Sequence, residues 1–77
     1  MTITAAVNKS LDSMFPYQEF TGLELQKMVN HYTGENPFVA TCLRLMQMWR
    51  AEFCEYNPLT VICLNRRKSL YRVVEKL

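Results

Sequence analysis

Apolar residues recur three and four positions apart near the start of the chain, which is the spacing of one face of a helix. The first stripe consists of Val7, Leu11, Met14 and Phe15. It predicts an amphipathic helix over about residues 4–14. Pro16 ends this helix because proline lacks the amide hydrogen that a helix interior requires. The connector from Tyr17 to Phe20 that follows is long enough to hold a brief strand.

A second helix is predicted from a start signal and a stop signal. Thr21 and Glu24 have the spacing of a capping box, in which each side chain binds the backbone amide of the other. The apolar stripe that follows consists of Leu25, Met28, Val29 and Tyr32. Gly34 suits the left-handed position after the last turn. His31 is expected to be an exposed residue near the helix end.

The third predicted helix is the longest, over about residues 37–53. Asn36 is a favoured N-cap residue, and Pro37 is tolerated at the first helical position, where its missing amide has no partner to lose. The expected core stripe consists of Val39, Cys42, Leu43, Met46, Trp49 and Phe53. Only about four residues separate this helix from the second, so the two must turn sharply against each other.

The pattern then changes to one typical of strands. Residues 60–64 are rich in β-branched side chains, and residues 69–74 provide a partner strand. The polar segment between them, residues 65–68, has the length of a hairpin turn and carries Arg66, Arg67 and Lys68. The expected fold is therefore α+β, with three helices and a C-terminal hairpin in one domain over residues 1–77.

Composition and charge limit the size of the core and indicate what kind of partner the chain would bind. The chain has 77 residues, of which 49% are hydrophobic, enough for one small core. Residues 1–40 carry two basic and four acidic side chains, and residues 41–77 carry seven basic and three acidic, so the second half is cationic. A cationic half favours an anionic partner.

Several classes of protein are disfavoured by the cysteines, the single histidine, the lengths of the apolar runs and the N-terminal sequence. Three cysteines without a CxxC pair argue against a disulfide framework and a zinc site, and Cys42 and Cys63 are expected in the core. With one histidine and no glycine-rich phosphate loop, we expect no catalytic site, metal or other cofactor. No apolar run is long enough to cross a bilayer, and the N-terminus does not resemble a signal peptide, so the expected location is the cytoplasm, without a membrane partner.

The order of helix, helix, tight turn, helix and basic hairpin resembles the winged helix-turn-helix family, in particular small bacterial and phage DNA-binding regulators. Residues 41–49 (TCLRLMQMW) are similar to the recognition helix of that family, with Thr41 and Arg44 outward and Cys42, Met46 and Trp49 in the core. Tyr71 and Val73 resemble the inward pair on the last wing strand. The resemblance implies that helix 37–53 enters the major groove of double-stranded DNA and that the wing, residues 60–74, contacts its backbone. A transcriptional regulator or a phage or prophage accessory protein would use DNA in this way.

The candidate DNA contacts divide by chemistry. Arginine can pair with guanine and glutamine with adenine, so Arg44 and Gln47 are the expected base readers. The remaining candidates are expected at the phosphate backbone or the minor groove: Asn36, Thr41, Arg50, Arg66, Arg67, Lys68 and Arg72.

Two features depart from the family pattern and leave a second function open. Leu45 and Met48 are apolar where a DNA reader is usually polar, and residues 54–57 (CEYN) replace the usual glycine before the wing. An exposed patch of Phe38, Leu45, Met48 and Leu77 would instead bind a second copy, a host protein or a phage protein. RNA binding is disfavoured because few aromatic side chains are expected at the surface.

Overall fold

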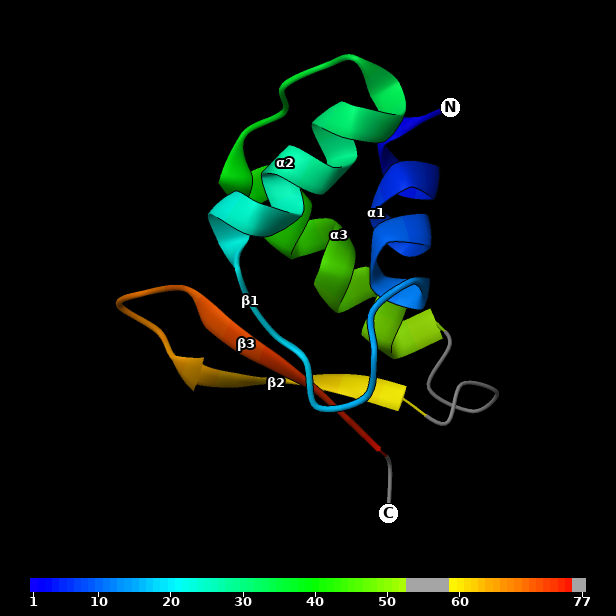
Figure 1. The fold of residues 1–77 in the computed structure, drawn as a ribbon. Coiled ribbons are helices and arrows are strands. Elements are labelled where there is room, and N and C mark those ends of the chain that lie inside the picture. The colour runs from blue at the N-terminus through cyan, green and yellow to red at the C-terminus, as the bar shows by residue number, and fades with distance from the viewer. Residues whose placement is uncertain (53–58, 76–77) are drawn as a thin grey trace.

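The computed structural model describes residues 1–52 and 59–75, with the side chains of residues 49–52 and 59 excluded. Over these residues the chain forms three helices and one three-stranded antiparallel sheet, which confirms the predicted α+β class. The elements in chain order are α1 (Ile3–Asp12), β1 (Glu19–Thr21), α2 (Gly22–Thr33), α3 (Val39–Glu52), β2 (Leu59–Asn65) and β3 (Leu70–Glu75) (Figure 1).

The sheet joins the two halves of the chain. Its strand order is β1-β3-β2, so the short β1 strand pairs with β3, the last strand of the hairpin. Phe20 lies opposite Tyr71, and Val61 lies opposite Val73. The helices form a layer beside the sheet, with the hairpin extending beyond them (Figure 1). Residues from both layers fill the core: Ala6, Val7, Leu11, Met14, Phe20, Leu25, Val29, Cys42, Met46, Val61 and Val73.

Local signals fix the ends of α2 as predicted. The Glu24 amide donates to Thr21 Oγ1 at 3.2 Å, and the Thr21 amide donates to Glu24 Oε1 at 3.3 Å, so the capping box is confirmed. Gly34 has φ +73°, the left-handed conformation expected after the last turn. His31 lies exposed in that last turn, also as predicted.

The first helix is shorter than its apolar stripe suggests. It ends at Asp12, and Ser13 caps it, with the Ser13 amide donating to the Lys9 carbonyl. Met14 therefore lies outside the helix but is still buried. Phe15, which was predicted to share the buried stripe, is 77% exposed because the chain has already left the helical path at that point. That part of the prediction is wrong.

The third helix begins two residues later than predicted. The Phe38 carbonyl accepts from the amides of Thr41 and Cys42, so the first helical turn starts from Phe38. Asn36 is therefore not the N-cap residue; it lies exposed in the connection between α2 and α3. Gln26 Nε2 donates to the Pro37 carbonyl at 2.6 Å, which ties this connection to α2. The predicted helix end and the core positions Trp49 and Phe53 lie outside the residues whose side chains are described.

The hairpin is confirmed, with one correction. Val73 is buried, and Tyr71 is half-buried with its ring stacked on Phe20 at a centroid distance of 5.7 Å. Cys63 was expected in the core but is exposed. Strand alternation puts Cys63 on the same face as the buried Val61, but the core ends at Val61, and Cys63 lies beyond it toward the turn.

Candidate nucleic-acid interface

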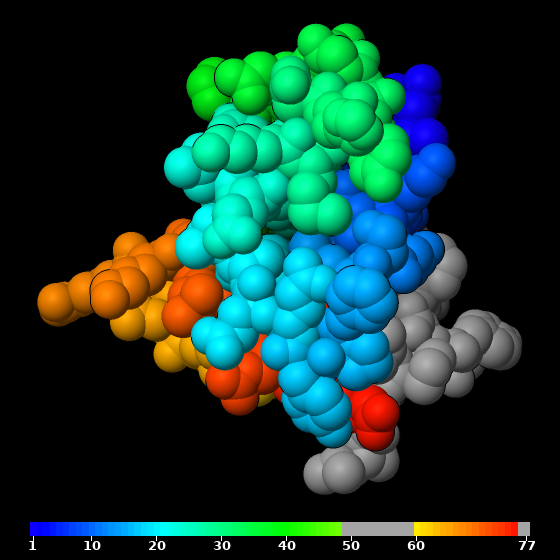
Figure 2. All heavy atoms as spheres, in the orientation of Figure 1, coloured from blue at the N-terminus to red at the C-terminus, as the bar shows by residue number. Residues whose placement is uncertain are grey.

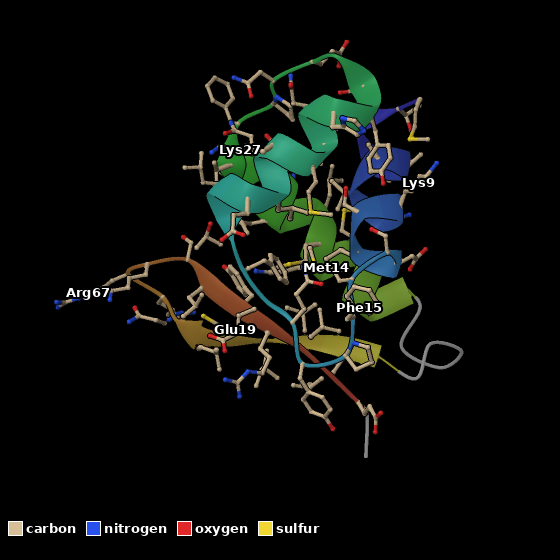
Figure 3. The ribbon with its side chains drawn as sticks, viewed as in Figure 1. Lys9, Met14, Phe15, Glu19, Lys27 and Arg67 are labelled. Atoms are coloured by element: carbon tan, nitrogen blue, oxygen red, sulfur yellow. The ribbon has the colours of Figure 1, made fainter. Side chains whose placement is uncertain are left out.

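The most prominent charged feature is the cationic turn, which we define as Arg66, Arg67 and Lys68 between β2 and β3. All three side chains are exposed, and the hairpin that carries them projects from the body of the molecule (Figure 2). Arg67 extends from its tip away from the helices (Figure 3). Among the described side chains, no carboxylate lies within ion-pair distance of these three residues. Their charges are therefore available to an anionic partner.

Backbone geometry holds the cationic turn in place. Asn65 Oδ1 accepts from the Lys68 amide at 3.2 Å, and the Arg66 carbonyl accepts from the Ser69 amide at 3.2 Å. Ser69 adopts φ +49°, which closes the turn into β3. None of these interactions uses a cationic side chain. The side chains of the turn can therefore be changed without removing the hydrogen bonds that shape it.

Tyr71 lies near the base of the turn. Burial raises the pKa of its hydroxyl, the nearby Cys63 adds to this effect, and the positive charge of Arg66 acts in the opposite direction. The tyrosine is therefore a neutral phenol at physiological pH.

The exposed side of α3 carries the two predicted base readers. Cys42 and Met46 are fully buried against the core, whereas Arg44 and Gln47 are exposed. Arg44 lies on the side of the helix opposite Cys42 and Met46, since each residue advances about 100° around the axis. Thr41 is half-buried at the edge of this surface. Burial raises the pKa of the Cys42 thiol, which agrees with its role as a small core residue.

Gly22 links α3 to the hairpin. A Cβ atom at Gly22 would lie 2.7 Å from Val39 Cγ1 and 3.5 Å from both Cδ atoms of Leu43, so α2 begins directly against the first turns of α3. The Gly22 amide donates to the carbonyl of Ser69, the residue after the cationic turn, at 3.0 Å. One residue therefore contacts both α3 and the end of the turn. Gln47 lies one turn beyond Leu43, on the same side of α3.

We expect Gly22→Ala to lower the free energy of unfolding by about 1–3 kcal/mol, measured by urea denaturation. The new methyl group would overlap Val39, whose branched side chain has little rotamer freedom, so α2 and α3 would have to separate. In a Val39→Ala background the same substitution should cost much less, because the overlapping Cγ1 atom is gone. Equal costs in the two backgrounds would contradict this account of Gly22.

Not every residue that was predicted to contact DNA lies in the candidate interface. Arg72 lies within the sheet, where its Nη2 atom donates to Glu19 Oε2 at 3.0 Å, so its charge is paired across β1 and β3. Asn36 is exposed in the α2–α3 connection. The side chain of Arg50 lies outside the described part of the chain. The candidate interface therefore consists of the cationic turn together with Arg44, Gln47 and the edge residue Thr41.

Among the described residues, no group of three or more His, Cys, Asp or Glu side chains is placed to hold a metal ion. An open depression of about 300 Å³ on α2 is lined by Lys27, Met28, His31 and Tyr32. Lys9 lies over the Tyr32 ring at 5.0 Å, a cation–π contact between α1 and α2. None of the helices in the described ranges is long and apolar enough to cross a membrane.

Neither Gly22 nor Ser69 was singled out as part of a site by sequence reasoning. A glycine directly after a capping threonine is the one available signal, because that position rarely needs glycine unless another element approaches closely.

Comparison with family models, with curated proteins and with solved structures found no match.

Proposed function

We propose that this chain is a winged-helix domain that binds double-stranded DNA, with α3 in the major groove and the β2–β3 hairpin as the wing. The element order and the strand order β1-β3-β2 are compatible with a winged helix. An α-helix fits the major groove, and basic side chains on a neighbouring hairpin suit the flanking phosphates. In this proposal, the protein is a small transcriptional regulator or a phage or prophage accessory protein.

The observation that carries the proposal is the double contact of Gly22. It packs against Val39 and Leu43 of α3 and donates to Ser69 at the end of the cationic turn. This contact supports one continuous surface that includes Arg44, Gln47 and the turn. A duplex lying across that surface would meet base-reading side chains and phosphate-binding side chains together.

The direct test is fluorescence anisotropy of a labelled random-sequence DNA duplex at about 50 and 200 mM salt. We expect binding at the lower salt and a marked loss at the higher, since affinity from phosphate contacts depends on released counterions. Absence of binding at low salt, with the fold intact by circular dichroism, would contradict the proposal.

A second candidate function, binding to another protein, is favoured by exposed apolar side chains on and beside α3. Phe38 is 82% exposed and Met48 is 48% exposed. Leu45, predicted to join them, is half-buried and packs against the core, so it does not belong to the patch. Leu77 lies outside the described residues.

The two functions differ in their response to Met48→Glu. If α3 binds a protein, this substitution should abolish association in a pull-down while Arg66→Ala with Arg67→Ala has little effect. If α3 binds DNA, the two-arginine change should dominate. Met48→Gln, which adds polarity without charge, is the matched control that separates charge repulsion from lost apolar contact.

A further inference from the structure

The three-stranded sheet has two edge strands, β1 and β2. In the strand order β1-β3-β2, β3 pairs on both sides, whereas β2 pairs with β3 alone among the described residues. An edge strand presents backbone donors and acceptors that can pair with another strand. The β2 strand has seven residues, longer than β1, and is therefore the edge best suited to such pairing.

The hydrogen bonds of Val73 show which β2 groups point outward. The Val73 amide donates to the Gln18 carbonyl at 2.9 Å, and the Val73 carbonyl accepts from the Tyr17 amide at 2.6 Å, so both groups point away from β2. Val61, opposite Val73, therefore forms a non-hydrogen-bonded pair with it. The N–H and C=O of Val61 point away from β3, and by the same alternation so do those of Cys63 and Leu59.

The β2 sequence, LTVICLN, contains no charged residue and no proline. Natural edge strands are commonly protected from pairing by charge, by proline or by a covering segment. Ile62 and Leu64 are each 39% exposed, so apolar surface accompanies the edge. We propose that β2 is a self-association surface, at which two copies of this chain pair their β2 strands antiparallel to form a six-stranded sheet.

The distribution of charge favours a second copy of this chain, in antiparallel orientation, as the strand that pairs with β2. Two identical uncharged strands meet without repulsion, and a two-fold axis makes the contact self-complementary. Antiparallel pairing places the two cationic turns at opposite ends of the interface. Each turn then lies at the end where the other copy carries the exposed Glu75, which pairs with Leu59. Parallel pairing would bring the six positive charges together.

The bulge in β2 sets the register. Regular pairing with β3 runs from Leu59 to Cys63, and the register shifts between Cys63 and Asn65. A two-fold axis through Val61 uses the whole regular segment. In that register Leu59 faces Cys63 of the second copy, with hydrogen bonds exchanged, and Thr60 faces Ile62 of the second copy as a non-hydrogen-bonded pair.

The unaltered chain provides the first test. Amide hydrogen exchange should show that Ile62 is protected at every concentration, since its amide points toward β3. The Val61 and Cys63 amides should become protected only as concentration rises, together with a monomer-to-dimer shift in analytical ultracentrifugation. A monomer up to the highest soluble concentration, or a dimer in which these two amides exchange freely, would overturn the proposal.

Disulfide trapping tests the register. Cα atoms of non-hydrogen-bonded pairs lie about 4.5 Å apart, within the range that a disulfide spans. In a background with Cys54→Ser and Cys63→Ser, a Thr60→Cys variant mixed with an Ile62→Cys variant should form a cross-linked heterodimer under mild oxidation. Each variant alone should cross-link much more slowly. Equal cross-linking in all three samples would overturn the register.

Two substitutions should separate dimer formation from folding. Cys63→Pro removes an amide that faces outward, so the hairpin keeps its bonds to β3 while the dimer loses two symmetric hydrogen bonds. Ile62→Glu introduces like charges across the two-fold axis, and within each chain the new carboxylate lies opposite Arg72, so the hairpin is not weakened. Each should raise the dimer dissociation constant roughly tenfold or more. The controls Cys63→Ser and Leu23→Glu should not. Dimers unaffected by either change, or abolished by Met48→Glu instead, would show that another surface or partner occupies this role.

Discussion

Replacing Arg66 and Arg67 by alanine together is expected to weaken duplex DNA binding by on the order of tenfold to a hundredfold at low salt, to a similar degree on every sequence. Both side chains are exposed on a projecting turn and have no ion-pair partner among the described side chains, so nothing in that part of the protein competes for their charge. The slope of log affinity against log salt should fall by about 1.8, because each phosphate contact contributes roughly 0.9. Fluorescence anisotropy over a salt series measures both quantities.

The matched control removes the same charge elsewhere. Lys9 on α1 and Lys27 on α2 lie on the helical layer, away from the tip of the hairpin (Figure 3). Lys9→Ala with Lys27→Ala changes the net charge equally, but should alter affinity and salt slope far less. Equal effects of the two double substitutions would mean that net charge alone drives binding, and the cationic turn would lose its assigned role.

Local chemistry made parts of this fold predictable from the sequence. The Thr21–Glu24 capping box and Gly34 involve neighbours in the chain, so their residue types are sufficient to locate the ends of α2. The hairpin is predictable for the same reason, since Asn65 and the following polar residues form its turn through contacts three positions apart. The exposure of Arg44 also follows from helical spacing once Cys42 and Met46 are assigned to the core.

Long-range contacts were not predictable in this way. The three-residue β1 strand exists because β3 pairs with it, and the ion pair between Glu19 and Arg72 joins residues 53 positions apart. Cys63 has the residue type of a core position, but its exposure depends on where the helices stop covering the sheet. The structural role of Gly22 was not predictable either. It depends on contacts with Val39 and Ser69, which lie far from Gly22 in the sequence.

Arg44→Ala should change sequence preference rather than general affinity. Arg44 is exposed on the side of α3 opposite the core and is one residue from Leu43, which packs against Gly22. In the proposed orientation it faces the base edges, where arginine pairs bidentately with guanine. We expect a loss of about 1–3 kcal/mol on the duplex preferred by the unaltered chain, and a much smaller loss on random duplexes. Selection of a preferred duplex from a random library, followed by anisotropy on both duplexes, provides the comparison.

Arg44→Lys distinguishes base reading from a phosphate contact. Lysine keeps the positive charge but lacks the planar pair of donors that matches guanine. If Arg44 reads a base, the lysine variant should lose sequence preference nearly as fully as the alanine variant, while its affinity for random DNA stays close to that of the unaltered chain. If lysine instead restores binding on all duplexes, Arg44 contacts a phosphate, and Gln47 becomes the remaining candidate reader on α3.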